Sequence, residues 1–204
     1  MSLFDALFGN TRRARPKMDA VFALPAALVD MELRGIRSLG VGGVCVRAPE
    51  GAAFAQAGEE IRRILDLYRA ERSLDLRTPG DDLGYTWWVL EAPGRAIDDV
   101  ATGLHMVGDE YRQRGYGDAL VAAAFPLEEV GAGPFTLIYN YRRGLYYPFV
   151  PLAGRHERDN AREIRLADLL PPSLPRESEL DRWYALWDAP LGRARALPDE
   201  EAGR

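Results

Sequence analysis

An aromatic segment at residues 134–151 predicts a β-hairpin and shapes the expected fold. Residues 135–141 are rich in aromatic and β-branched side chains, which suit a pleated, half-buried strand. Gly144 stands where the turn needs a positive φ, and residues 145–150 form the return strand. Pro148 cannot donate a hydrogen bond to a ladder. The return strand is therefore predicted to lie at a sheet edge or to end there.

Two interpretations of this hairpin remain open. In the first, it is part of the core and its tyrosine hydroxyls reach solvent. In the second, it is a partner-binding surface, because Tyr and Arg are enriched in interface hot spots. The predicted partner-binding residues are Tyr141, Arg142, Arg143, Tyr146 and Tyr147.

The segments before the hairpin alternate between strand-like and helix-like patterns. Strands are expected near residues 40–47, 74–77, 84–91 and 118–127, and amphipathic helices near 54–68 and 96–114. This order predicts an α+β fold, an antiparallel sheet with helices on one face. We expect a split βαβ (ferredoxin-like) core followed by the hairpin and a C-terminal helix. A secretion-chaperone-like α+β topology is the alternative.

Three segments make up the predicted domain organisation. Residues 1–17 form an amphipathic and basic N-terminal arm, residues 18–190 a single α+β domain, and residues 191–204 a disordered tail. Within the domain, residues 161–170 are ambiguous between helix and strand. Ser178 and Asp181 have capping-box spacing and predict a short helix, whose Trp183 and Trp187 would anchor it to the body.

The N-terminal arm combines an apolar turn with a basic cluster. Its predicted membrane-contact residues are Leu3, Phe4, Leu7, Phe8, Arg12 and Arg13. Apolar side chains at helical spacing next to basic residues are typical of segments that lie on an anionic membrane surface. The alternative is that the apolar turn packs on the protein's own core and the basic stretch is a linker.

Composition excludes several kinds of chemistry. Cys45 is the only cysteine, so neither an intrachain disulfide nor a cysteine-based zinc cluster can form. His105 and His156 have no partner at metal-ligand spacing. We therefore predict no metal site, no cofactor and no catalytic residues. The polar loop at residues 155–160 is the best catalytic candidate, and a solvated loop is its ordinary interpretation.

Charge and hydropathy bear on partners and location. The net charge of −5 argues against a broad nucleic-acid-binding surface. The sequence has no apolar run near 18 residues and no signal-peptide pattern, which predicts a cytoplasmic protein with at most peripheral membrane contact. The sequence also allows a homodimer, formed by edge pairing of the strand that contains Pro148.

Several segments together resemble one family. They are residues 1–9, 19–25, 43–54, 84–90, 139–152, 158–161 and 181–190, of which the hairpin and the Trp183–Trp187 segment are the most specific. They resemble the PspA-associated protein PspAB family of the phage-shock envelope-stress system. The resemblance implies an accessory protein that acts alongside PspA, a coiled-coil protein that coats stressed inner membrane. It implies no catalytic residue set.

Two functions follow as hypotheses. The first is a non-enzymatic adaptor that binds PspA or associated proteins near the inner membrane. The second is a small-molecule sensor or enzyme with a pocket between sheet and helices, near His105 or His156. An enclosed polar pocket with perturbed titratable groups would favour the second. A flat surface with an exposed apolar patch would favour the first.

Overall fold

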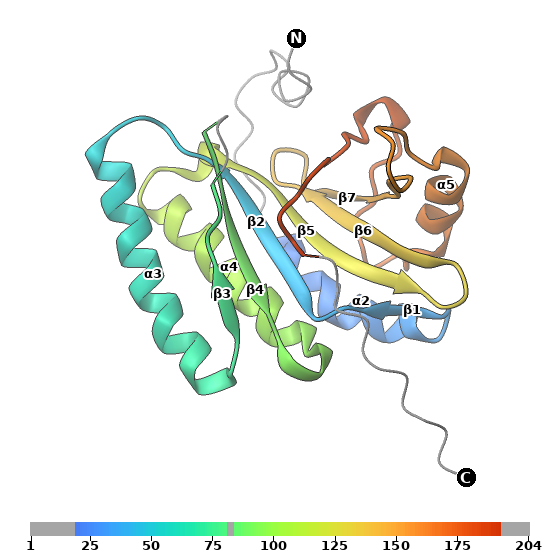
Figure 1. The fold of residues 1–204 in the computed structure, drawn as a ribbon, viewed down its shortest axis with the longest axis horizontal. Helices are drawn as coiled ribbons and strands as arrows, with labels where there is room; N and C mark the ends of the chain where they lie inside the picture. Colours follow the sequence, from blue (N-terminus) through green and yellow to red (C-terminus); the bar gives the residue numbers. More distant parts are fainter. Residues whose placement is uncertain (1–18, 81–83, 193–204) are drawn as a thin grey trace.

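An antiparallel sheet forms the centre of the protein in the computed structural model, which describes residues 19–80 and 84–192 (Figure 1). The strands are β1 (Ile36–Ser38), β2 (Val41–Arg47), β3 (Asp75–Arg77), β4 (Tyr85–Glu91), β5 (Leu120–Glu129), β6 (Gly133–Asn140) and β7 (Leu145–Phe149). Six of them follow the order β3-β4-β2-β5-β6-β7, and β1 pairs with the C-terminal end of β5, residues 127–129. The predicted antiparallel sheet is therefore confirmed.

Helices connect strands that are not neighbours in the sheet. The α-helices are α2 (Ala23–Glu32), α3 (Ala52–Arg72), α4 (Ile97–Gln113) and α5 (Asn160–Leu169). Helix α3 links β2 to β3, with β4 lying between those strands, and α4 links β4 to β5 across β2. The α+β class is confirmed. The ferredoxin-like classification stays a prediction.

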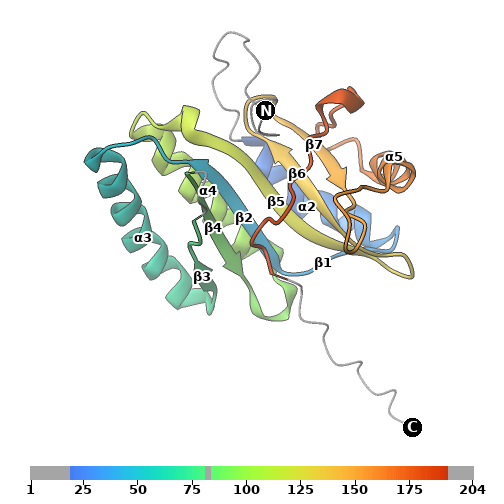
Figure 2. The ribbon, with the colours of Figure 1, turned by 45° about the horizontal axis from the view of Figure 1, so that its top comes forward.

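Helices α2, α3 and α4 cover one face of the sheet (Figures 1 and 2). Their inward side chains join one core cluster with side chains of the strands. On α3 and α4 the apolar stripes were predicted from period-3.6 spacing, and Ile61, Leu65 and Leu104 from these stripes are buried. Helix α5 lies elsewhere, beside the edge strand β7, which it contacts. It resolves the ambiguity at residues 161–170 in favour of a helix.

The opposite face of the sheet is covered by the C-terminal segment, residues 183–191, which crosses it (Figure 1). Trp183, Leu186 and Leu191 from this segment are buried against the sheet's second face. Leu191 reaches as far as Gly43, in the middle of β2. The described fold thus extends past the predicted domain boundary at residue 190. Residues 1–18 and 193–204 lie outside the described residues, so the arm and the tail stay predictions.

The short helix predicted from Ser178 is wrong. Only a single 3-10 turn, Leu180–Arg182, forms there, and Leu180 is 54% exposed instead of packed with the tryptophans. The physical reason is that bonds to the hairpin hold the segment in an extended path. The N–H of Glu177 donates to the carbonyl of Tyr146 at 2.8 Å, and the indole N–H of Trp183 donates to the carbonyl of Glu177 at 3.1 Å. Trp183 does anchor the segment, as expected, but without a helix.

The aromatic hairpin is confirmed as β6 and β7, with Tyr139 opposite Tyr146 and Leu137 opposite Pro148. Asn140 shapes the turn: its side-chain oxygen accepts from the N–H groups of Arg142 and Arg143 at 3.0 and 3.2 Å. Gly144 has a φ of 71°, which few other residues adopt without strain.

Strand β7 is the last strand of the sheet, as Pro148 predicted, but its outer edge is occupied. The N–H of Tyr146 donates to the carbonyl of Pro175 at 2.7 Å, and that of Val150 donates to the carboxylate of Glu163 at 2.7 Å. Pro148, between them, has no N–H. These donors are therefore not available for pairing with a second copy along this strand. Homodimerisation itself stays a prediction.

Candidate partner-binding surfaces

The three tyrosines predicted to contact a partner are buried. Tyr141, Tyr146 and Tyr147 are each at most 1% exposed. The hydroxyl of Tyr146 donates to the carbonyl of Ala20 at 3.0 Å, and that of Tyr147 donates to the carbonyl of Tyr184 at 3.1 Å. The hairpin is thus a core element, and the hydroxyls of Tyr146 and Tyr147 bond inside the protein instead of reaching solvent. A docked partner could not touch these three side chains in this conformation, and their predicted role in partner binding stays a prediction.

Arg142 and Arg143 lie on the turn and are partly exposed. Arg143 forms an ion pair with Glu177, which is only 2% exposed, and a second one with Glu179 at 3.5 Å. The hydrogen bond from Arg143 to the Glu177 carboxylate raises the pKa of the arginine. Arg143 is therefore held toward residues 177–179. Whether the two arginines bind a partner stays a prediction.

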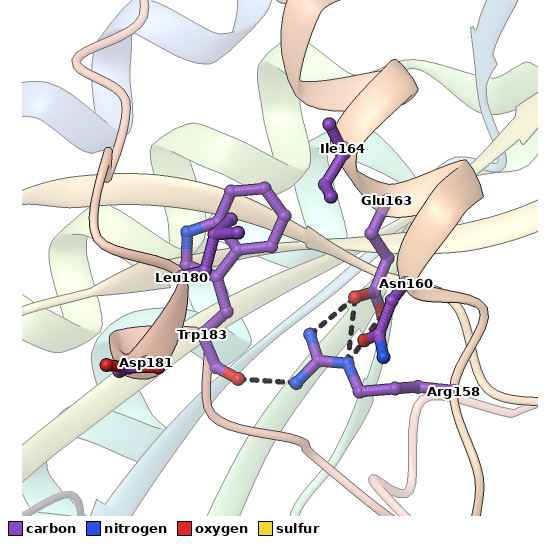
Figure 3. Close-up of a pocket in the computed structure, with 7 residues that line it drawn as sticks. All are labelled: Arg158, Asn160, Glu163, Ile164, Leu180, Asp181 and Trp183. Atoms are coloured by element: carbon purple, nitrogen blue, oxygen red, sulfur yellow. Dashed lines mark hydrogen bonds and ion pairs between the residues drawn. The ribbon is translucent and has the colours of Figure 1, made fainter.

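A pocket of about 310 Å³ opens on the other side of Leu180, between α5 and the 180–183 turn (Figure 3). We call it the α5 pocket; it is lined by Arg158, Asn160, Glu163, Ile164, Leu180, Asp181 and Trp183. Helix α5 begins here because the Asp159 side chain accepts from the N–H of Arg162 at 2.9 Å, an N-cap bond. The cap places Glu163 on the helix side that faces Trp183.

Arg158 and Glu163 form the polar side of the α5 pocket. The Glu163 carboxylate is 1% exposed and accepts from Arg158 Nε at 3.0 and 2.8 Å, while Arg158 Nη1 donates to the carbonyl of Trp183 (Figure 3). Burial raises the pKa of Glu163, although the hydrogen bonds from Arg158 and from the N–H of Val150 act in the opposite direction. The pair ties α5, the preceding loop and the C-terminal segment together.

The apolar side of the α5 pocket is exposed. Ile164 is 45% exposed and Leu180 is 54% exposed, and they come from segments that are distant in the sequence. Large apolar side chains gathered at one opening often mark a contact site for another protein. Ile164 and Leu180 thus form the exposed apolar part of the α5 pocket, and its lining also includes the charged residues Arg158, Glu163 and Asp181.

The histidines do not join this pocket. His105 lies on α4, where its ring stacks on Phe22 with centroids 3.7 Å apart. His156 packs against Trp187 with centroids 5.2 Å apart. Thus the polar loop at residues 155–160 is split between roles: Asp159 caps α5, whereas Arg158 and Asn160 line the α5 pocket. Over residues 19–80 and 84–192, no group of three His, Cys, Asp or Glu side chains could hold a metal ion.

The predicted membrane-contact residues lie outside the described residues. This holds for all six: Leu3, Phe4, Leu7, Phe8, Arg12 and Arg13. Among the helices that the structure describes, none is long and apolar enough to cross a bilayer.

Sequence reasoning missed Ile164, Leu180 and Glu163. Leu180 lies in the segment that was predicted to form a short helix, which does not form. The burial of Glu163 depends on contacts with Val150 and Arg158, which no local pattern indicates. The one available signal was Asp159-Asn160 ahead of an apolar pattern, which marks a helix start.

Comparison with known proteins gives one assignment. No curated protein and no solved structure matches the chain. The family model described as PspA associated protein B, PspAB, matches residues 1–191. The chain therefore belongs to the PspAB family, as its resemblance indicated.

Proposed function

We propose that this protein is a non-enzymatic adaptor of the PspA membrane-stress response that binds PspA, or a protein associated with it, near the inner membrane. Membership of a family described as PspA-associated, over nearly the whole chain, supports an accessory role of this kind. The observation that carries the binding hypothesis is the exposed pair Ile164 and Leu180 at the mouth of the α5 pocket.

Arg143 on the hairpin turn pairs with Glu179, the residue directly before Leu180, which lines the α5 pocket. An apolar centre with a polar and charged rim is the usual anatomy of a protein–protein contact. The proposed contact surface therefore keeps Arg142 and Arg143 as rim residues and replaces the buried tyrosines with Ile164 and Leu180.

Binding of purified PspA to the full chain, measured by isothermal titration calorimetry, tests this surface. We expect Leu180→Asp and Ile164→Asp each to weaken binding about tenfold or more, because truncating or charging a central anchor costs roughly 2 kcal/mol. Leu67→Asp is the matched control, since Leu67 is 74% exposed on the far helix α3. Arg142→Glu with Arg143→Glu should slow association more than it speeds release.

Unchanged affinity in both α5-pocket variants would remove this surface from the proposal. Unchanged affinity in the double arginine variant would remove the hairpin turn. If the wild-type chain itself does not bind PspA, titration with other proteins that co-purify with PspA tests whether the contact is indirect.

A small-molecule sensor is the second candidate, because the α5 pocket contains a buried carboxylate whose pKa is raised by burial. The pocket lies beside α5, whereas the sequence suggested a pocket between sheet and helices, near His105 or His156. A thermal-shift screen with small amines and small carboxylic acids tests this candidate. A shift that Glu163→Gln abolishes, without loss of PspA binding, would favour a sensor over an adaptor.

A cytoplasmic position beside the membrane is part of the proposal. Vesicle co-sedimentation with anionic and neutral lipids, with and without PspA, measures whether the chain reaches the membrane alone. Salt-sensitive binding without PspA supports direct contact through the arm. Binding only in the presence of PspA supports recruitment by the partner.

A further inference from the structure

Helix α2 is apolar on both sides, which is unusual for a helix on the outside of a sheet. Its inner side buries Leu24, Ala27, Leu28 and Met31. Its outer side carries Phe22 from the preceding 3-10 turn, then Ala26, Val29 and Leu33, all exposed. We call these four residues the α2 stripe. A helix that is apolar all round is normally covered on all sides.

The α2 stripe has the spacing of a packing seam. Its members follow one another at intervals of four, three and four residues, so they line one side of the helix and its end. Val29 is 65% exposed and Leu33 86% exposed, values far from those of the buried inner side. Helix α3, by contrast, turns Glu59 and other charged side chains outward and needs no cover.

Two carboxylates flank the α2 stripe. Asp30 and Glu32 are both exposed, one on each side of the line from Phe22 to Leu33. The surface therefore calls for a segment that has apolar side chains and carries positive charge.

The N-terminal arm fits this description and is joined to the α2 stripe. It has four large apolar residues at positions 3, 4, 7 and 8, followed by Arg12, Arg13, Arg15 and Lys17. The chain between residues 8 and 22 can extend over roughly 40 Å, whereas α2 is only about 15 Å long. A segment tethered so closely has an effective concentration in the millimolar range.

We propose that the arm folds back and covers the α2 stripe, with Leu3, Phe4, Leu7 and Phe8 against Val29 and Leu33, and its basic cluster near Asp30 and Glu32.

Disulfide trapping in the full chain tests this contact. One variant combines Leu7→Cys with Val29→Cys, and its matched control combines Leu7→Cys with Leu67→Cys on the exposed side of α3. Native Cys45 is buried and stays in both. A disulfide needs Cα atoms within about 7 Å. We expect the intramolecular bond to form about tenfold faster with Val29→Cys, at a rate independent of protein concentration.

Hydrogen exchange supplies a second readout that needs no new bond. In the full chain, Leu7→Glu with Phe8→Glu should raise the exchange rate of the α2 amides several-fold relative to wild type, with those of α4 unchanged.

Equal trapping rates at positions 29 and 67, or unchanged α2 exchange, would overturn the proposal. Trapping that yields dimers and accelerates with concentration would assign the α2 stripe to a second copy. No PspA is present, so these results are independent of the proposed adaptor function.

Discussion

Arg158 and Glu163 form an ion pair in which Nη2 lies 2.7 Å from Oε2 and the carboxylate is almost completely buried. Because the guanidinium also donates to the carbonyl of Trp183, this pair connects the start of α5 to the segment that covers the sheet. Its position explains how a chain segment without regular secondary structure is held in place.

Removing one member of this pair should be costly. Glu163→Ala is expected to lower the free energy of unfolding by about 3 kcal/mol, because it leaves a partly buried guanidinium and the N–H of Val150 without their acceptor. Glu157→Ala is the control: its pair with Arg155 is exposed and should change stability by less than about 0.5 kcal/mol. Urea unfolding of both variants checks this, and equal effects would contradict it.

Stability should respond to pH in opposite ways at Glu163 and Glu129. Burial raises the folded-state pKa of Glu163 above its ordinary value of 4.5, so its contribution is full below pH 4.5 and is lost as pH rises through the folded pKa. Hydrogen bonds from Arg165 chiefly, and also from Arg162, lower the pKa of Glu129. Its contribution is present above pH 4.5 and is lost as pH falls through the folded pKa.

Two variants separate these effects. The stability of wild type relative to Glu163→Gln should decline as pH rises above about 4.5, and that relative to Glu129→Gln should decline as pH falls below about 4.5. Thermal unfolding between pH 3 and pH 8 measures both differences. Parallel pH profiles for the two variants would show that the pKa directions are wrong.

The packing of Leu191 on β2 should require a glycine at position 43. A Cβ atom at Gly43 would lie 2.6 Å from Leu191 Cδ2 and 3.1 Å from Trp87 Cε3. Gly43→Ala is therefore expected to cost about 1–3 kcal/mol, as overpacking does. The cost should shrink in a Leu191→Ala background, which a double-mutant cycle detects.

Gly58→Ala serves as the control for this cycle. It lies on α3, where the nearest atom to its Cβ, Tyr111 Oη, is 3.6 Å away. It should stabilise the protein by up to about 1 kcal/mol, since alanine favours a helix over glycine. A strictly additive Gly43→Ala and Leu191→Ala pair would mean that Leu191 does not cover β2.

Removing a buried tyrosine hydroxyl should change the stability in opposite directions at positions 141 and 147. Within the part of the chain that the structure describes, the hydroxyl of Tyr141 is buried without a hydrogen-bond partner, and burial raises its pKa. Tyr141→Phe should therefore raise stability by about 1 kcal/mol, because an unsatisfied buried hydroxyl is lost. Tyr147→Phe should lower it by about 1 kcal/mol, because the carbonyl of Tyr184 loses its donor. Chemical denaturation of the two variants compares them directly, and a loss at position 141 would indicate a partner for its hydroxyl.

Local pattern was sufficient for the hairpin and for helices α3 and α4. Alternating aromatic residues, the turn glycine and period-3.6 stripes act over a few residues, and α3 and α4 bury the side that their pattern predicted. Pro148 also identified the last strand of the sheet correctly, since a missing N–H is a property of one residue. The family resemblance, carried by segments along the whole chain, was likewise present in the sequence alone.

Tertiary contacts decided the rest. The capping-box pattern at Ser178 favoured a helix, but the N–H of Glu177 donates to the carbonyl of Tyr146, which holds that segment beside β7, and Leu180 is exposed. From the sequence alone, the hairpin tyrosines could equally face a partner. In the fold, the carbonyls of Ala20 and Tyr184 accept hydrogen bonds from two of their hydroxyls. Periodicity in a sequence defines which side of an element is apolar. Only long-range packing determines what covers that side, and therefore whether the side becomes part of the core or part of a binding surface.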